Sequence, residues 1–247
     1  MLERNRILLG STGLSVSRLS FGTAFMGFRG DCLSPEEGAG LLLQAYGLGI
    51  NFWDTSEDYG TQIHIAHALR KLPRDQVVIS SKVNLPAKPV DAMLDELEIK
   101  CLDILLIHDV ELGEIDEAKA TLESCQAEKA LGRIRTLGIS THDSEVADLV
   151  GTWSEVEVLM LPINFSGYCL PDRPIKGGLT YMMQAAEKAW RSGKGIVGMK
   201  VMGGGKIAND PQAAISFVAG LGYVHSLCIG MRSTTEIMQN SRLVNLG

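Results

Sequence analysis

Short runs of apolar residues alternate along the chain with longer segments in which apolar positions recur at helical spacing. A buried parallel strand gives a continuous apolar run because helices cover both faces of its sheet. Eight such runs are present, at residues 19–21, 50–53, 77–81, 104–107, 136–139, 156–161, 195–199 and 224–229. Helices are predicted at residues 35–48, 61–71, 91–101, 114–131, 143–150, 179–192, 211–221 and 234–243. Eight alternating units favour an α/β fold that closes into a (β/α)8 TIM barrel over an open sheet.

Two local signals refine this pattern. Residues 34–37 (SPEE) predict the start of the first helix, with a serine cap, a first-turn proline and two acids that the helix dipole favours. Near the N-terminus, residues 6–9 and 14–16 flank a loop at 10–13 that has glycine at both ends. These segments predict a β-hairpin whose loop is longer than two residues.

The bulk properties narrow the class of protein. A chain of 247 residues is close to the ~250 residues typical of one such barrel, and no linker or low-complexity tract divides it, so residues 1–247 are predicted to form one domain. The net charge of -6 argues against an electrostatic nucleic-acid binder. We expect a monomer or small homo-oligomer with no nucleic-acid partner.

Cysteine usage and apolar content indicate the compartment. The five cysteines show no CxxC pair and no metal-ligand spacing, which suggests reduced thiols and no metal site. The N-terminus lacks the apolar run of a signal peptide. No apolar stretch reaches the ~20 residues needed to span a bilayer. A cytoplasmic protein without a membrane partner is expected.

Four polar residues stand where strand-like runs stop, namely Asp54, Tyr59, Lys82 and His108. Polar groups at successive strand ends gather on one rim of a parallel barrel. An unperturbed tyrosine has a pKa near 10, and a nearby ammonium lowers it by stabilising the phenolate. Lys82 is the candidate cation, with Asp54 holding it by a charge-assisted hydrogen bond. Taken singly, each of the four has an ordinary structural interpretation. Together they suit carbonyl chemistry better than hydrolysis.

Several stretches resemble one known family. Residues 49–60 (GINFWDTSEDYG) resemble the aldo-keto reductase signature around its catalytic Asp and Tyr. Residues 77–83 resemble the family's strand with the catalytic Lys, and residues 102–108 the strand with the catalytic His. Further matches lie at residues 13–23, 137–140 and 230–233, followed by Asn240. They follow the family's order over nearly the whole chain.

The resemblance implies a carbonyl reductase that uses NADPH, with NADH possible, and a hairpin that closes the bottom of the barrel. Tyr59 would donate the proton, Lys82 and Asp54 would tune it, and His108 would orient the carbonyl of a small-molecule substrate. The implied cofactor-binding residues are Gly22, Thr23, Ser140, Asn164, Lys200, Val201, Met202, Gly203, Gly230, Met231, Arg232 and Asn240.

The chain departs from the family's pattern at three positions in or near the implied cofactor site. Thr141 stands where an asparagine usually follows the serine, and Lys200 where many members stack an aromatic ring on the nicotinamide. Glu236 stands where 2′-phosphate binders often place arginine, which weakens the expectation of NADPH. A second cation at Lys200 would favour a negatively charged substrate.

Other interpretations remain open. The protein could be a cofactor-binding redox sensor or regulatory subunit with little turnover, or a Schiff-base aldolase that uses Lys82 or Lys200. The glycine-rich residues 198–206 could approach a pyrophosphate or form a flexible loop. His64 and His67 have a spacing that can bind metal, but we expect both on the surface. Because the sequence ends soon after the last helix, we also expect an open rim and weak binding of small aldehydes.

Overall fold

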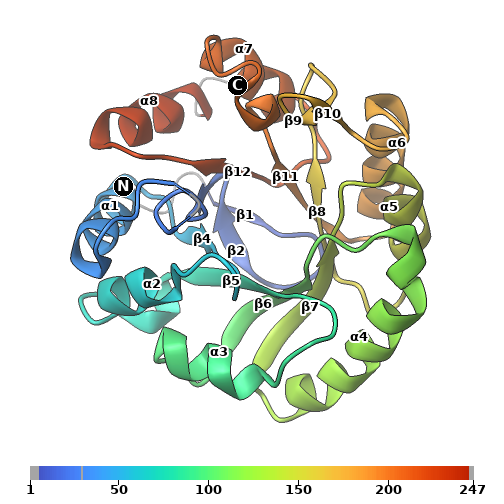
Figure 1. Ribbon diagram of the computed structural model, residues 1–247, viewed down its shortest axis with the longest axis horizontal. Coiled ribbons are helices and arrows are strands. Elements are labelled where there is room, and N and C mark those ends of the chain that lie inside the picture. The colour runs from blue at the N-terminus through green and yellow to red at the C-terminus, as the bar shows by residue number, and fades with distance from the viewer. Residues whose placement is uncertain (1–5, 29, 245–247) are drawn as a thin grey trace.

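The predicted apolar runs form a closed barrel of parallel strands. The computed structural model describes residues 6–28 and 30–244. In it the strands neighbour one another in the order β11-β12-β3-β4-β5-β6-β7-β8, and the ring closes (Figure 1). Their bounds are β3 Leu19–Gly22, β4 Phe52–Asp54, β5 Val78–Val83, β6 Leu102–Ile107, β7 Ile134–Ser140, β8 Val158–Pro162, β11 Gly195–Met199 and β12 Ser226–Gly230. The prediction of a (β/α)8 barrel is confirmed.

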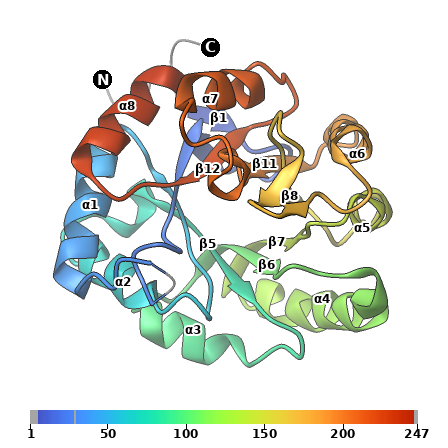
Figure 2. The same cartoon turned by 45° about the horizontal axis from the view of Figure 1, so that its top comes forward.

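Helices follow the strands and form the outer ring of the barrel, as Figures 1 and 2 show. Their bounds are α1 Pro35–Gly47, α2 Gln62–Leu69, α3 Val90–Leu97, α4 Ile115–Ala130, α5 Ser144–Val150, α6 Leu179–Arg191, α7 Pro211–Ala219 and α8 Thr234–Val244. The first helix begins as its sequence predicts, since the Ser34 side chain accepts from the Glu37 amide while Glu37 bonds back to the Ser34 amide.

The N-terminal hairpin closes one end of the barrel. Its strands are β1 Arg6–Leu8 and β2 Ser15–Ser17, paired antiparallel. Gly10 in the loop has φ 54°, and a Cβ there would collide with the backbone at the start of β11. The loop therefore lies against the end of the barrel at which its strands begin. Leu14 and Val16 enter the apolar cluster inside the barrel, so the expected bottom plug is confirmed.

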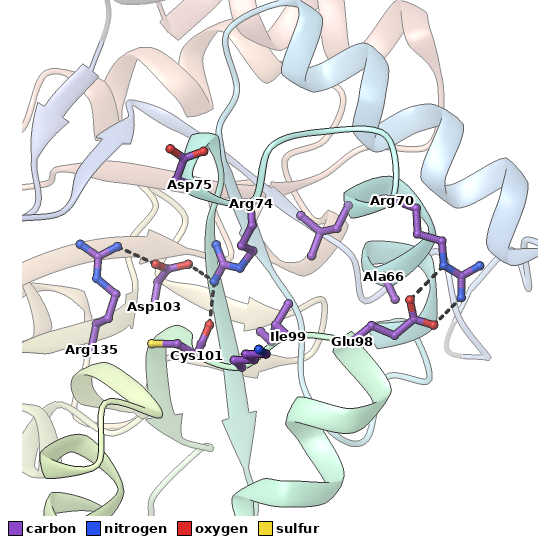
Figure 3. A pocket seen from close by; sticks show the side chains of 11 residues that line it. Ala66, Arg70, Arg74, Asp75, Glu98, Ile99, Cys101, Asp103 and Arg135 are labelled. Carbon is purple, nitrogen blue, oxygen red and sulfur yellow. Dashed lines mark hydrogen bonds and ion pairs between the residues drawn. The ribbon is translucent and has the colours of Figure 1, made fainter.

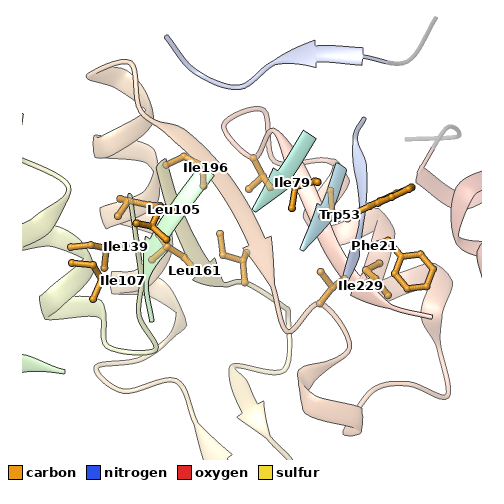
Figure 4. Packing of buried hydrophobic residues seen from close by; sticks show 14 of the residues in the cluster. Phe21, Trp53, Ile79, Leu105, Ile107, Ile139, Leu161, Ile196 and Ile229 are labelled. Carbon is orange, nitrogen blue, oxygen red and sulfur yellow. The ribbon is translucent and has the colours of Figure 1, made fainter. Parts of the chain in front are cut away.

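Alternating side chains of each strand divide the core into two clusters. Ile104 and Leu106 point into the barrel, whereas Leu105 and Ile107 pack outward against the helices. Figure 4 shows part of the outer cluster, with Trp53 of β4 near Ile79 of β5. Burial on both faces explains why the strands are uninterrupted apolar runs.

Two features differ from the sequence prediction. Helix α3 ends at Leu97 and does not reach residue 101, because Glu98 takes a left-handed conformation with φ 55° that closes the helix. A second hairpin, β9 Tyr168–Leu170 with β10 Arg173–Pro174, follows β8 and was not predicted. It inserts beyond the carboxyl end of a barrel strand, where the loops of such folds build the site. In the described part of the chain, we find no helix both long and apolar enough to cross a membrane.

Candidate active site

A buried ion pair lies at the carboxyl ends of β4 and β5. The Lys82 ammonium donates to both carboxylate oxygens of Asp54, at 2.6 and 2.7 Å, and to the carbonyl oxygen of Thr55 at 2.7 Å. Asp54 is only 3% exposed and Lys82 1%. All three ammonium hydrogens are thus used within the protein. The predicted ion pair between Asp54 and Lys82 is present, and both side chains are almost completely shielded from solvent.

Burial and charge act on Lys82 in opposite directions. Burial has the largest single effect and lowers the pKa of the Lys82 ammonium, but the charge and hydrogen bond of Asp54, together with Tyr59 and Cys228, raise the pKa above its usual range. The lysine therefore stays protonated at neutral pH. A Schiff-base nucleophile needs a free amine, so this environment argues against the aldolase interpretation for Lys82.

Tyr59 lies in the loop after β4, above this pair. The Lys82 nitrogen is 5.1 Å from the centre of the Tyr59 ring. Burial raises the pKa of Tyr59, and the positive charge of Lys82 lowers it by less. The expected effect of Lys82 is thus present, but desolvation outweighs it. Tyr59 carries its proton at neutral pH, as a proton donor must.

His108 follows β6 and stands edge-on to Tyr59, with ring centres 5.8 Å apart. Its Nδ1 lies 3.0 Å from Asn84 Oδ1. The Asn84 amide is oriented by its own Nδ2, which donates to Glu57 at 3.1 Å. We therefore assign the ring hydrogen to Nδ1, donating to Asn84.

A second neighbour agrees with this tautomer. The Ser56 hydroxyl lies 3.3 Å from His108 Nδ1, and it donates its own hydrogen to Asp58 at 2.6 Å. Ser56 can then only accept from the imidazole. Burial and the positive charge of Lys82 lower the pKa of His108 to about 4, so the ring is neutral at pH 7. Its Nε2 carries a lone pair and can accept a hydrogen bond but not donate one.

Several groups that were not predicted from the sequence support these residues. The Ser80 hydroxyl donates to Asp54 Oδ1 at 2.6 Å. The partly buried Cys228 of β12 lies close enough to Asp54 for desolvation and the carboxylate to raise the pKa of its thiol. Polar Ser80 and Cys228 inside otherwise apolar strands were the available signal.

Two of the predicted cofactor-binding residues, Ser140 and Asn164, form hydrogen bonds within the protein. The Ser140 hydroxyl accepts from the Asp109 amide at 2.9 Å. Asn164 is fully buried, and its Nδ2 donates to the carbonyls of Tyr168 at 2.8 Å and Lys200 at 3.0 Å. Asn164 therefore joins the β9–β10 hairpin to the end of β11. Its role toward a cofactor stays a prediction.

The glycine-rich segment after β11 is ordered and includes a short 3-10 helix, η3 Gly203–Gly205. The Gly203 amide donates to the Lys200 carbonyl at 2.7 Å. A Cβ on Gly204 would collide with the backbone of Cys169 in β9. Glycine is required here because the segment packs closely against that strand.

At the start of α8, an anion already occupies a main-chain donor. The Glu236 carboxylate accepts from the Arg232 amide at 2.8 Å. The Arg232 guanidinium lies 4.8 Å from the Phe25 ring centre and 3.3 Å from an Asp31 oxygen. Glu236 thus reduces the attraction of this helix start for a phosphate.

The remaining predicted cofactor residues differ in accessibility. Met202 and Gly230 are partly exposed, and Arg232 is exposed. The other five are buried, namely Gly22, Thr23, Val201, Met231 and Asn240. Thr23 bonds to the carbonyl of Asp54 at 2.9 Å, so it supports the strand end.

Comparison with known proteins identifies the family to which the chain belongs. The Aldo/keto reductase family model matches residues 18–217. The chain belongs to the aldo/keto reductase family. Its identification by resemblance is confirmed.

Similarity to individual proteins is moderate. The chain is 30% identical over 149 residues to L-galactose dehydrogenase of Arabidopsis thaliana, covering 53% of this chain and 47% of that protein. It is 25% identical over 210 residues to the NADH-specific methylglyoxal reductase of Escherichia coli (strain K12), covering 70% and 62%. The chain thus spans about half to two thirds of the length of these relatives.

A solved structure shares the fold. An aldo-keto reductase from Klebsiella pneumoniae in complex with NADPH superposes with a TM-score of 0.74 at 17% identity, covering 98% of this chain and 89% of that one. The same barrel is therefore shared across nearly the whole length of both chains.

Other charged residues and histidines of this aldo/keto reductase lie away from the Asp54–Lys82 pair. A groove of about 600 Å³ at the opposite end of the barrel holds Asp103 between Arg74 and Arg135 (Figure 3). His64 is buried and bonds the Leu33 carbonyl, so its expected surface position was wrong. His67 pairs with Glu36.

The neutral state of His108 predicts a pH-dependent stability. An unfolded histidine has a pKa near 6.5, whereas the folded pKa is about 4. Between these values only the unfolded chain takes up the proton, so His108 costs stability as the pH falls, reaching about 3 kcal/mol below pH 4. Urea denaturation near pH 7, 5.5 and 4 should show a smaller loss for His108→Gln than for the wild type. Parallel curves for the two proteins would contradict the lowered pKa.

Proposed function

We propose that this protein is a nicotinamide-dependent oxidoreductase that reduces aldehydes or ketones to alcohols. The observation that carries the proposal is the buried Lys82–Asp54 pair beneath Tyr59 and beside His108. Family membership supports the same reaction class.

In this proposal Tyr59 is the proton donor. A bound nicotinamide supplies the hydride, which no side chain can deliver. Tyr59 gives its phenolic proton to the carbonyl oxygen, and the Lys82 ammonium stabilises the phenolate that remains. Asp54 and the Thr55 carbonyl hold that ammonium in place. Displacement of water by substrate and cofactor strengthens the effect of Lys82 on Tyr59.

The tautomer of His108 changes its expected role. A carbonyl oxygen has no hydrogen to offer, so neutral Nε2 cannot orient it by donating. Nε2 can accept from an alcohol hydroxyl. This favours a second candidate function, oxidation of an alcohol by the reverse reaction. The names of L-galactose dehydrogenase and of the Pseudomonas relative D-threo-aldose 1-dehydrogenase agree with that direction.

The cofactor would be NADPH or NADH. The accessible groups on the rim suit a dinucleotide, because Arg232 offers a cation and the segment after β11 is lined by glycine backbone. We propose that Arg232, Gly230 and Met202 contact it. We also propose a cytoplasmic monomer or small homo-oligomer, in agreement with its free cysteines.

Fluorescence titration of the purified protein with NADPH and NADH, followed by an aldehyde panel, tests the proposal. Binding with turnover supports it. No binding of either cofactor would remove the oxidoreductase assignment, and binding without turnover in either direction would favour a sensor or regulatory role.

Cofactor choice should depend on Glu236. We expect Glu236→Arg to raise the affinity for NADPH relative to NADH by about tenfold, the effect of ~1.4 kcal/mol, because a carboxylate that repels a 2′-phosphate becomes a cation that binds it. Glu236→Gln is the control that removes charge alone and should have a smaller effect. An unchanged ratio of dissociation constants in both variants would place the 2′-phosphate elsewhere.

A further inference from the structure

Lys200 stands at the carboxyl end of β11, the end of the barrel at which Asp54, Lys82 and His108 also lie. Its backbone has φ 55°, a left-handed conformation that is uncommon outside glycine. The structure holds it there, because its carbonyl accepts from Asn164 Nδ2 at 3.0 Å and from the Gly203 amide at 2.7 Å. Such held outliers cluster at functional sites.

The Lys200 ammonium is a cation without a dedicated partner. It is partly buried, and within residues 6–28 and 30–244 it makes no hydrogen bond or ion pair. The charged or titratable groups that act on it are Cys169, Asp109, Cys228 and Lys82. Lys82 and Cys228 belong to the group of residues around Asp54, so the Lys200 ammonium lies within electrostatic reach of that group at the same end of the barrel.

None of these neighbours neutralises the charge. Burial raises the pKa of Cys169 to about 11 and that of Cys228 above its usual range, so both thiols are neutral at pH 7. The Asp109 carboxylate is engaged by His142. Lys82 carries the same sign as Lys200. Burial lowers the pKa of the Lys200 ammonium and outweighs the opposing charge of Asp109, which forms no ion pair with Lys200 in the described part of the chain.

We propose that Lys200 binds the carboxylate of an acidic carbonyl substrate, an oxo acid whose carbonyl group lies at Tyr59. This inference rests on the proposed function. An ion pair shielded from solvent is stronger than one on the surface, so an entering anion would be held and would restore the charge balance. A single ammonium matches a monoanionic carboxylate better than the two charges of a pyrophosphate. Lys200 would accordingly determine substrate specificity instead of holding the cofactor.

A matched pair of substrates isolates this contribution. 4-Carboxybenzaldehyde and methyl 4-formylbenzoate differ in charge and share the aldehyde. We expect Lys200→Met to lower kcat/KM for the acid by roughly 10–100-fold, the effect of losing a hydrogen bond to a charged group, and to leave the ester nearly unchanged. Lys200→Arg should restore part of the preference for the acid.

Lys206 provides the control. It lies on the same rim, 3.7 Å from the centre of the Tyr168 ring, and it bonds the Pro171 carbonyl at 3.1 Å. Lys206→Met removes an equal charge and should leave the ratio of acid to ester unchanged. An equal change in both lysine variants would reduce the effect to long-range electrostatics and overturn the proposal.

Binding measurements separate this inference from the proposed function. Benzoate should bind the wild type in the presence of NADPH and bind Lys200→Met at least tenfold more weakly. If no aldehyde is turned over, the proposed function fails, and benzoate binding still decides the role of Lys200. Equal benzoate affinity in both proteins, or a loss of NADPH affinity in Lys200→Met without a change in acid preference, would overturn the inference.

Discussion

Tyr59→Phe is expected to lower the rate of aldehyde reduction by about 10²–10⁴-fold, the usual cost of losing a general acid. The ring remains above Lys82, 5.1 Å from its nitrogen in the native protein, so packing is preserved and only the acidic hydroxyl is lost. Cofactor affinity should therefore stay nearly unchanged. Steady-state kinetics with NADPH fluorescence titration of the same preparation separates the two effects.

A matched control is available on the same rim. Tyr168→Phe removes a hydroxyl from β9. The cation over the Tyr168 ring is Lys206, whereas the cation over the Tyr59 ring is Lys82. It should retain nearly full activity. Near wild-type turnover of Tyr59→Phe would show that the proton comes from another group, and a comparable loss in both variants would point to a general disturbance of the rim.

Lys82→Met is expected to destabilise the fold by about 3–5 kcal/mol, because removing one partner of a buried ion pair leaves an uncompensated charge. Asp54, 3% exposed, would keep the Ser80 hydroxyl as a donor but lose its cation. Reduction should also be lost, since no ammonium remains to stabilise the Tyr59 phenolate. Urea denaturation and kinetics measure the two losses.

The pH dependence of that variant has a definite sign. Without Lys82, the folded state would bury the Asp54 carboxylate with no cation beside it, which disfavours its charged form. The folded state then binds the proton more tightly, so the variant should regain stability relative to the wild type as the pH falls. The double variant Asp54→Asn/Lys82→Met, which carries neither charge, should recover much of the stability at pH 7. No recovery would mean that lost packing, and not the buried charge, causes the destabilisation.

Regular elements were predictable where local chemistry and burial agreed. The apolar run at 195–199 coincides with β11 Gly195–Met199, because a strand covered on both faces shows no polar interruption. The end of α3 was missed, since a left-handed Glu98 carries no sequence signal comparable to glycine. The β9–β10 hairpin was missed because its short strands are partly exposed and show no strong apolar run.

The sequence alone determined the alternation of strands and helices, and hence the barrel and the strand ends at which Asp54, Lys82 and His108 stand. Only the tertiary structure decided their chemistry, because ionisation depends on burial and on neighbours distant in sequence. Burial keeps Tyr59 protonated against the pull of Lys82. The Asn84 amide, itself oriented by Glu57, places the hydrogen of His108 on Nδ1. Closure of the barrel likewise leaves the Lys200 ammonium partly buried and without an ion pair among the described residues, an electrostatic property that no single segment of the chain encodes.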